Sequence, residues 1–270
     1  MPDARPLSSV PRPPSVPPSG GSGGDLDRGL ETGDGGPAKK GYLLEVFSSF
    51  QGEGPYAGLR QVFVRTSGCH LRCAYCDTPE SWNRSPTWKL GGESRTNPVT
   101  VDEALEAIRS LGPHPSVSFT GGEPILQAEF VREVAFGARA LGMKTYLDTS
   151  GTLADRLAAC ADAIDVFAFD VKLPSCEGVR MDWEDTRRCL ELTEGREAFV
   201  KIVVLQDSRE DEVARAAALV PAGMPVILQL ATPVNPATVP PDGRKLARLR
   251  AACGRDVVVL PQLHVLAGWK

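Results

Sequence analysis

Short apolar segments alternate with amphipathic segments from Tyr42 to the end of the chain. Apolar runs bounded by Gly, Pro or polar residues predict strands, and apolar residues at helical spacing predict helices. The predicted strands are Tyr42–Phe50, Gln61–Thr66, Val117–Thr120, Lys144–Thr149, Val166–Asp170, Phe199–Leu205, Val226–Leu230 and Val257–Leu260. The predicted helices are Val101–Leu111, Phe130–Leu141, Asp182–Glu194, Glu210–Leu219 and Arg244–Ala252.

This alternation predicts an α/β fold, in which parallel strands are joined by helical crossovers. About six such β/α units are too few for a closed eight-stranded barrel, so we expect an open, partial TIM-like barrel. Ligands of parallel α/β folds bind at the carboxyl-terminal ends of the strands. We therefore expect the functional residues at that edge, where the polar motifs of the chain fall.

Residues 1–39 lack this pattern. Prolines between Pro11 and Pro18 lead into glycines between Gly20 and Gly24, and almost nothing in this stretch can be buried. Such a composition predicts a disordered tail, to which we assign no part in catalysis. The remaining residues, 40–270, are expected to form one catalytic domain.

Charge and cysteine usage exclude several classes of protein. The 30 Lys and Arg residues against 34 Asp and Glu give a net charge of −4, which argues against a general nucleic-acid surface. No run of about eighteen apolar residues predicts a membrane span, and no apolar N-terminal segment predicts a secretory signal. The cysteine count of 7 is odd, and a chain of 270 residues can bury an ordinary core, so a disulfide framework is not expected. These features together predict a reducing cytoplasm.

Three cysteines with the spacing C-x3-C-x2-C carry the strongest chemical information. Cys69, Cys73 and Cys76 follow one another closely, and Tyr75 directly precedes the last of them. Soft thiolate ligands suit iron, and three of them can hold three irons of a cubic [4Fe–4S] cluster. One iron would then remain open for a small molecule.

A zinc site is the main alternative for this cysteine run. Structural zinc normally takes four ligands, often from two separate pairs, whereas the other cysteines are isolated. These are Cys160, Cys176, Cys189 and Cys253. His70 could complete a zinc site, but it directly follows Cys69 and would strain a tetrahedral arrangement. The cluster is the favoured interpretation.

A second motif, Thr120-Gly121-Gly122-Glu123-Pro124, follows the predicted strand Val117–Thr120. Two adjacent glycines let the backbone approach a ligand, so that bare N–H and C=O groups can bind amino or carboxylate groups. By itself a Gly-Gly turn after a strand is common. Beside the cysteine run it is far more specific.

Together the two motifs resemble the radical S-adenosylmethionine (SAM) superfamily. In that superfamily three cysteines hold a [4Fe–4S] cluster whose open iron binds the amino and carboxylate groups of SAM. An electron from the cluster cleaves the sulfonium and produces a 5′-deoxyadenosyl radical. The resemblance implies that Cys69, Cys73 and Cys76 hold the cluster, with Tyr75 near the adenine and Gly122 near the methionine amino group.

A narrower resemblance extends over residues 42–270. Phe50–Gly54, Phe63–Arg65, Gly68-Cys69, Cys76–Thr78 and Gln262–His264 are ordered as in the 7-carboxy-7-deazaguanine synthases. Those enzymes of queuosine and deazapurine biosynthesis convert 6-carboxy-5,6,7,8-tetrahydropterin to 7-carboxy-7-deazaguanine, with hydrogen abstraction at C6, ring contraction and loss of ammonia. The resemblance implies SAM and Mg2+, an electron donor such as flavodoxin, and a homodimer.

The resemblance also implies roles for individual positions. It assigns the pterin substrate to Phe50, Gln51, Gly52, Glu53, Arg65, Thr120, His264 and Lys270. It assigns Mg2+ to Thr78. It assigns SAM to Tyr75, Cys76, Asp77, Gly122, Asp148, Ser150, Asp170, Val171, Lys172, Gln229, Leu230, Ala231 and Thr232.

For several of these residues a physical argument supports the assigned role, but a simpler structural role is also possible. Gln51 offers a donor and an acceptor to a pterin edge, but it could be only a turn residue. The planar fork of Arg65 matches a carboxylate, although such arginines often form surface ion pairs. The Thr78 hydroxyl is a hard oxygen ligand for Mg2+, or a helix N-cap. His264 could be a structural histidine.

The sequence departs from the family pattern at three points. Asp148-Thr149-Ser150-Gly151 replaces a more usual Glu-Thr-Asn-Gly, Val265 stands where lysine is typical, and Cys176 stands where serine is commoner. The first departure bears on the hydrogen bonds expected around SAM.

Two other functions fit part of the pattern. An activating protein for a glycyl-radical enzyme shares the cysteine spacing, but it acts on a protein backbone. Gln51, Glu53, Arg65 and His264 favour the pterin. A non-catalytic iron–sulfur or zinc protein would leave the Gly-Gly-Glu-Pro turn without a cosubstrate.

Overall fold

A computed structural model describes residues 39–175 and 181–269. They belong to the second of the two units into which the chain divides, Ala38–Lys270. Nearly all of the predicted tail, together with Cys176 and Lys270, lies outside the described residues. The disordered tail and the role of Lys270 therefore stay predictions.

The described elements follow the predicted series closely. The strands are β1 (Lys40–Gly41), β2 (Leu43–Phe50), β3 (Arg60–Thr66), β4 (Thr87–Leu90), β5 (Glu93–Thr96), β6 (Val99–Thr100), β7 (Ser116–Gly121), β8 (Lys144–Thr149), β9 (Val166–Asp170), β10 (Glu197–Val204), β11 (Val226–Leu230) and β12 (Val258–Leu260). The helices are α1 (Val101–Ser110), α2 (Ala128–Ala140), α3 (Ala154–Ala158), α4 (Trp183–Glu191), α5 (Glu210–Leu219), α6 (Gly243–Ala252) and α7 (Leu263–Leu266). Four single-turn 3-10 helices are η1 (Gly54–Tyr56), η2 (Pro79–Trp82), η3 (Pro124–Gln127) and η4 (Ala161–Ala163).

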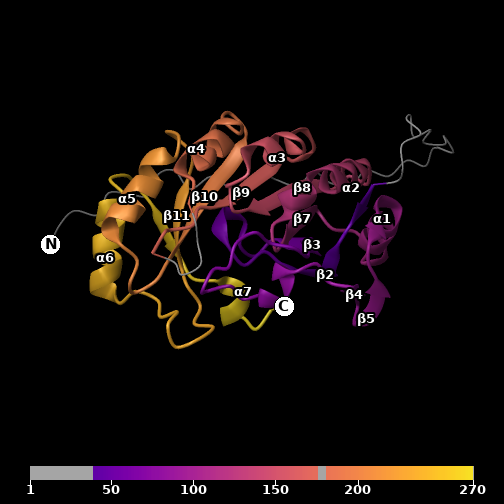
Figure 1. Cartoon of the computed structure of the whole chain (residues 1–270), viewed down its shortest axis with the longest axis horizontal. Helices are drawn as coiled ribbons and strands as arrows, with labels where there is room; N and C mark the ends of the chain where they lie inside the picture. Colours follow the sequence, from indigo (N-terminus) through magenta and orange to yellow (C-terminus); the bar gives the residue numbers. More distant parts are fainter. Residues whose placement is uncertain (1–38, 176–180, 270) are drawn as a thin grey trace. The chain divides into compact units, whose positions relative to one another are not determined.

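Within the described residues, the main sheet has ten strands in the order β12-β11-β10-β9-β8-β7-β3-β2-β4-β5. All neighbours from β3 to β12 are parallel. The order ends at β12 on one side and β5 on the other, so the sheet is open. This confirms the predicted open α/β fold. Figure 1 shows helices α2 to α6 along the outer side of this sheet.

The core explains why these segments fold as strands. Strands between two layers are buried on both faces and read as continuous apolar runs. In β9, for example, Phe167, Ala168 and Phe169 are fully buried. The helices bury one apolar stripe against them, and α1 begins at a capping box formed by Thr100 and Glu103.

The β4–β5 hairpin was absent from the sequence prediction, which did predict β2 and β3 as strands. β2 pairs antiparallel with β3, and the β4–β5 hairpin extends the sheet beyond β2. In β4, Trp88 and Leu90 are buried and alternate with exposed residues. This alternation over only four residues, followed by Gly91-Gly92, was the available indication of a hairpin.

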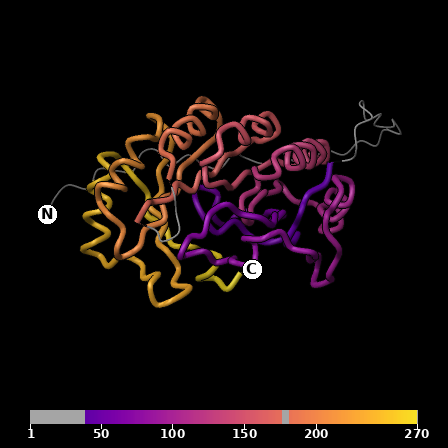
Figure 2. Tube along the Cα trace, in the orientation of Figure 1, coloured from indigo at the N-terminus to yellow at the C-terminus, as the bar shows by residue number. Residues whose placement is uncertain are grey.

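The strand register gathers polar residues at one edge. Arg65 on β3 lies opposite Thr120 on β7, and Asp170 on β9 lies opposite Lys201 on β10. Asp148 is the second-last residue of β8, the strand between β7 and β9. The trace in Figure 2 follows this edge, where the indigo loop after β2 approaches the yellow C-terminal segment. There the Leu263 N–H donates to the Gly52 carbonyl at 2.9 Å.

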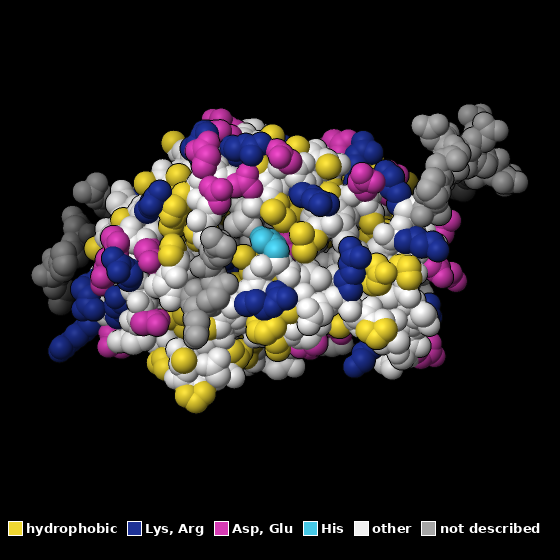
Figure 3. Space-filling model, in the orientation of Figure 1, with side chains coloured by type: hydrophobic (Ala, Val, Ile, Leu, Met, Phe, Trp, Pro, Cys, Tyr) yellow, Lys and Arg dark blue, Asp and Glu magenta, His cyan; other side chains and the backbone are white. Residues whose placement is uncertain are grey.

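Surface features agree with the composition. No helix in the described part of the chain is both long and apolar enough to cross a membrane. On the face drawn in Figure 3, basic and acidic side chains are interspersed over the surface.

Candidate active site

A cavity lies at the carboxyl-terminal edge of the parallel strands, and it brings most of the predicted site residues together. Its lining includes Phe50, Gln51, Gly52, Glu53, Arg65, Cys69, Cys73, Tyr75, Cys76, Asp77, Thr120, Gly122, Asp148, Ser150, Asp170, Lys172, Gln229, Ala231, Thr232 and His264. Three predicted residues among those described do not line it. Thr78 is buried and donates a hydrogen bond to Asp77, while Val171 belongs to the core and Leu230 packs against it.

The cysteine run forms an irregular loop between β3 and η2. Cys73 is buried and packs with Leu71, while Cys69 and Cys76 are half-buried beside them. In the described part of the chain, no three His, Cys, Asp or Glu side chains lie close enough to hold a single metal ion. In a cubic cluster each thiolate binds a different iron, so the cysteines need to share one pocket rather than converge on one point.

Burial sets the protonation of these thiols. It raises the pKa of Cys69 to about 11 and raises the pKa of Cys76 as well. Both thiols are therefore protonated in the metal-free chain, and binding iron displaces their protons. Three soft sulfur donors on one cavity wall are a fitting set for a [4Fe–4S] cluster.

The Gly-Gly-Glu-Pro turn packs tightly against this loop. The Gly122 N–H donates to the Thr66 carbonyl at 3.1 Å. A Cβ atom on Gly122 would lie 2.3 Å from the Gly68 carbonyl oxygen and 2.7 Å from that of Ser81. Only glycine fits here, and the turn lines the same cavity as Cys69.

Replacing Gly122 by alanine is expected to destabilise the fold by about 1–3 kcal/mol, as overpacking does. In a protein of this size that corresponds to a fall in melting temperature of roughly 3–10 °C, measurable by calorimetry. Gly243→Ala is the matched control, because a Cβ atom on Gly243 meets nothing within 4 Å. Equal melting temperatures for the two variants would contradict the close packing of the turn.

Glu123, the acidic residue of the turn, was not assigned a role from the sequence. Its carboxylate is buried and accepts hydrogen bonds from the Thr149 hydroxyl at 2.7 Å and the Ser150 N–H at 2.9 Å. The Ser150 hydroxyl also donates to it and contacts Thr152 at 2.9 Å. The serine that replaces the usual asparagine therefore directs its hydroxyl to Glu123 in this structure.

A second polar group lines the cavity at the end of β9. The Lys172 ammonium lies 2.7 Å from Asp170 and 5.1 Å from the ring centroid of Tyr75. Burial lowers the pKa of Lys172, but Asp170 outweighs this effect, and the pKa stays well above its usual value. The other Asp170 oxygen and the Gln229 amide oxygen are buried without a hydrogen-bond partner among the described residues. Both are free to accept from a ligand.

Arg65 lies on the opposite side of the cavity. Its Nε is 3.1 Å from Glu45, and its Nη1 donates to the Thr78 hydroxyl at 3.3 Å. Thr78 in turn donates to Asp77 at 3.1 Å. The guanidinium also stacks 5.5 Å from the ring centroid of Phe47, so its direction is fixed by several contacts.

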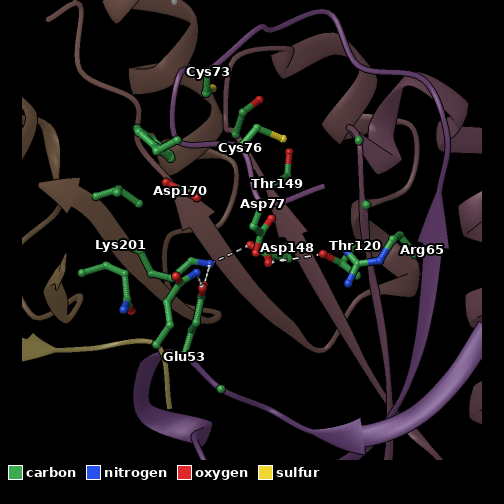
Figure 4. A pocket seen from close by; sticks show the side chains of 18 of the residues that line it. Glu53, Arg65, Cys73, Cys76, Asp77, Thr120, Asp148, Thr149, Asp170 and Lys201 are labelled. Carbon is green, nitrogen blue, oxygen red and sulfur yellow. Dashed lines mark hydrogen bonds and ion pairs between the residues drawn. The ribbon is translucent and has the colours of Figure 1, made fainter. Parts of the chain in front are cut away.

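Lys201 is the most important residue that the sequence analysis missed. Its side chain is only 3% exposed, and its ammonium contacts Glu53 and lies 3.0 Å from Asp148 (Figure 4). Gln262 donates to the other Glu53 oxygen at 2.7 Å. A lysine in the apolar strand segment Phe199–Leu205 was the available indication, because a buried lysine requires an acidic partner.

These contacts separate the pKa values of the two carboxyls. Burial raises the pKa of Glu53, but the charge of Lys201 and the hydrogen bonds from Lys201 and Gln262 outweigh it and lower the pKa to about 2. Burial, together with the negative charges of Glu53 and Asp170, raises the pKa of Asp148 to about 6 despite Lys201.

Asp148 is therefore expected to take up a proton as the pH falls through about 6, compared with an ordinary value of 3.8. Infrared spectra of the protein should show a protonated-carboxyl band that grows across this range. Asp148→Asn should abolish the band, whereas Asp162→Asn, which removes an exposed carboxyl of lowered pKa, should leave it unchanged. A band that persists in Asp148→Asn would assign the proton elsewhere.

The C-terminal segment closes the remaining side. Gly52 lies against His264, because a Cβ atom on Gly52 would come 1.9 Å from the His264 Nδ1. The Phe50 and Trp269 rings lie 4.9 Å apart. Gln51 donates to Gln61 at 3.2 Å and accepts from the Glu53 N–H at 3.1 Å, so its amide also shapes the loop.

Comparisons with known proteins agree with this geometry. The radical SAM superfamily matches residues 63–219. The 7-carboxy-7-deazaguanine synthase of Geobacter sulfurreducens is 35% identical over 243 residues, which cover 84% of this chain and 96% of that protein. The synthase of Methanopyrus kandleri is 36% identical over 239 residues, covering 83% and 92%.

A solved structure supports the fold. QueE from Escherichia coli matches with a TM-score of 0.59 and 21% sequence identity, covering 83% of this chain and 95% of that one. This structural similarity supports the fold, whereas the family assignment depends on the sequence matches. Because those matches extend over nearly the full length of the relatives, the chain belongs to the radical SAM superfamily and, within it, to the 7-carboxy-7-deazaguanine synthase family.

Proposed function

We propose that this protein is a lyase that converts 6-carboxy-5,6,7,8-tetrahydropterin to 7-carboxy-7-deazaguanine, with loss of ammonia, in queuosine and 7-deazapurine biosynthesis. The observation that carries the proposal is the shared cavity. Its wall combines the cysteine loop, the Gly-Gly turn and the polar strand ends, within a chain that belongs to the synthase family.

Cys69, Cys73 and Cys76 would hold the [4Fe–4S] cluster. The backbone of Gly122 and the free oxygens of Asp170 and Gln229 would bind polar groups of SAM. The remaining positions assigned to SAM would surround it, with Val171 and Leu230 taking part through their backbone. When bound, the cluster and SAM supply the radical that starts the ring contraction.

Mg2+ would be held by Thr78 with Asp77 beside it. A hydroxyl and a carboxylate are hard oxygen ligands, and Mg2+ often takes few protein ligands and keeps several waters. The Thr78 hydroxyl also accepts a hydrogen bond from Arg65, so the residue proposed to hold Mg2+ and this arginine lie side by side.

The substrate would lie between Arg65 and the C-terminal segment. Arg65 offers the fork that a carboxylate matches. Glu53 is ionised, and each of its oxygens keeps acceptor capacity for the N–H donors of an aminopyrimidinone ring. Thr120, Gln51 and His264 complete this side, and the ring contact of Phe50 with Trp269 helps to exclude water.

Three further assignments come from the family resemblance and are part of the proposal. The enzyme would receive electrons from a donor such as flavodoxin, form a homodimer and work in the cytoplasm. Each can be tested separately, by reduction with purified flavodoxin, by sedimentation of the native protein and by localisation in cells.

The test of the function is anaerobic reconstitution with iron and sulfide, followed by incubation with SAM, a reductant and the carboxylated tetrahydropterin. We expect 7-carboxy-7-deazaguanine, identified by mass, and release of ammonia. Cleavage of SAM without deazaguanine would favour an activating protein for a glycyl-radical enzyme. A single bound zinc without labile sulfide would favour a non-catalytic metal protein.

A further inference from the structure

We propose that Lys201 is a positioning residue, which fixes the carboxylates of Glu53 and Asp148 relative to one another and so sets the hydrogen-bonding pattern offered to the pterin. The inference rests on the proposed function for the identity of the ligand. The placement of Lys201 itself rests on contacts within the chain.

The geometry isolates Lys201 from water and gives it two acidic partners from different elements. Its ammonium contacts Glu53, from the loop after β2, and lies 3.0 Å from Asp148, at the end of β8. Glu53 is also held by Gln262, and Asp148 accepts a long hydrogen bond from Thr120 at 3.5 Å. Lys201 is thus the link between the C-terminal side of the cavity and the side formed by β7 and β8.

Lys201 orients the Glu53 carboxylate but leaves it able to accept further hydrogen bonds. A carboxylate oxygen can accept about two hydrogen bonds, and among the described residues each Glu53 oxygen has one donor, Lys201 or Gln262. One acceptor position on each oxygen remains for a ligand. Two parallel acceptors match the adjacent ring N–H and amino group of an aminopyrimidinone.

The titratable groups around Lys201 explain why a neutral residue at this position should disturb the two carboxyls. Asp148 and Tyr146 face it from β8, Asp170 from β9 and Glu53 from the loop after β2, while His264 of α7 acts on Glu53. Without the ammonium, Glu53 and Asp148 would be buried acids near a third acid, Asp170. Like charges in a shared buried site force one of them to bind a proton. A protonated Glu53 would lose part of its acceptor pattern.

The test compares the reconstituted wild type with Lys201→Met, Lys201→Arg and a control, Lys245→Met. Lys245 is also a buried lysine with an acidic partner, Glu210, but it lies on α6 outside the cavity lining. We expect Lys201→Met to raise the KM for the pterin by about 10- to 100-fold, as loss of a charged hydrogen-bond partner does. The acidic limb of kcat/KM should move to higher pH by about one unit or more. Lys201→Arg should recover part of both effects, and Lys245→Met should match the wild type.

A substrate-free measurement separates this inference from the proposed function. In infrared titrations, the carboxyl that takes up a proton near pH 6 in the wild type should do so at higher pH in Lys201→Met. If the wild type makes no deazaguanine, the proposed function fails while this titration still decides whether Lys201 controls the pair. An unchanged titration, KM and pH profile in Lys201→Met would overturn the positioning role. Should Lys201→Met not fold, Lys201→Gln carries the same expectations.

Discussion

Cys73→Ala will leave the protein unable to keep a [4Fe–4S] cluster, and deazaguanine formation will fall below detection. Cys73 is the buried member of the three cysteines, so no outside ligand can replace its thiolate easily. A cubic cluster bound by two thiolates has lost a third of its protein ligands. After anaerobic reconstitution, iron and sulfide contents should fall from about four each per chain to a small fraction of that.

Cys253→Ala is the matched control for this experiment. Cys253 is equally buried, but it caps α6 and donates to the Leu249 carbonyl at 3.4 Å, outside the cavity lining. Its variant should keep full cluster content and activity. Normal iron and sulfide in Cys73→Ala, or an equal loss in Cys253→Ala, would mean that the cysteine loop is not the cluster site.

The fold could be predicted because its elements are marked by local patterns. Buried parallel strands read as apolar runs, and amphipathic helices separate them, so the order of β7 to β12 and the helices α2, α4, α5 and α6 between them followed from the sequence. The five-residue helix α3, between β8 and β9, was not predicted, because it is too short to show a helical period. The β4–β5 hairpin was missed because β5 is exposed along its whole length. An exposed strand has no hydrophobic period to reveal it. The short helix α7 was missed because none of its residues is buried.

The candidate site likewise contains residues that could be predicted from the sequence and residues that could not. The cysteine run and the Gly-Gly turn could be found because their spacing is local in sequence. The cluster of Glu53, Asp148 and Lys201 could not, because residues 148 positions apart, Lys201 and Glu53, meet only through the strand order. Glu123 was overlooked for the same reason, since its partners Thr149 and Ser150 come from another strand end.

Three basic side chains that line the cavity are each paired with an acidic side chain. Lys201 is paired with Glu53 and Asp148, Lys172 with Asp170, and Arg65 with Glu45. Paired charges are held in fixed directions before a ligand arrives, so little reorganisation is needed on binding. Arg65 is the cation of this set placed beside Thr78, the proposed Mg2+ ligand, and recognition of the substrate carboxylate should therefore depend on it.

Arg65→Met is accordingly expected to raise the KM for the carboxylated pterin by about 100-fold. In the complex Arg65 and the substrate carboxylate would form a buried charge pair, and truncating one partner of such a pair typically costs about 2–5 kcal/mol. Arg65→Lys should be intermediate, since lysine keeps the charge but not the planar fork. Steady-state kinetics of the reconstituted enzyme measures both. Arg248→Met, which removes an exposed arginine paired with Glu210 on the surface, should leave the KM unchanged.

A pterin without the carboxylate distinguishes recognition from support of the fold. If Arg65 binds the substrate carboxylate, binding of this analogue, measured as inhibition, should change little between wild type and Arg65→Met. If Arg65 only holds Glu45, Thr78 and the loop that carries them, the analogue and the substrate should weaken together. Parallel weakening would remove Arg65 from the substrate site and leave it a structural role between β2, β3 and the cysteine loop.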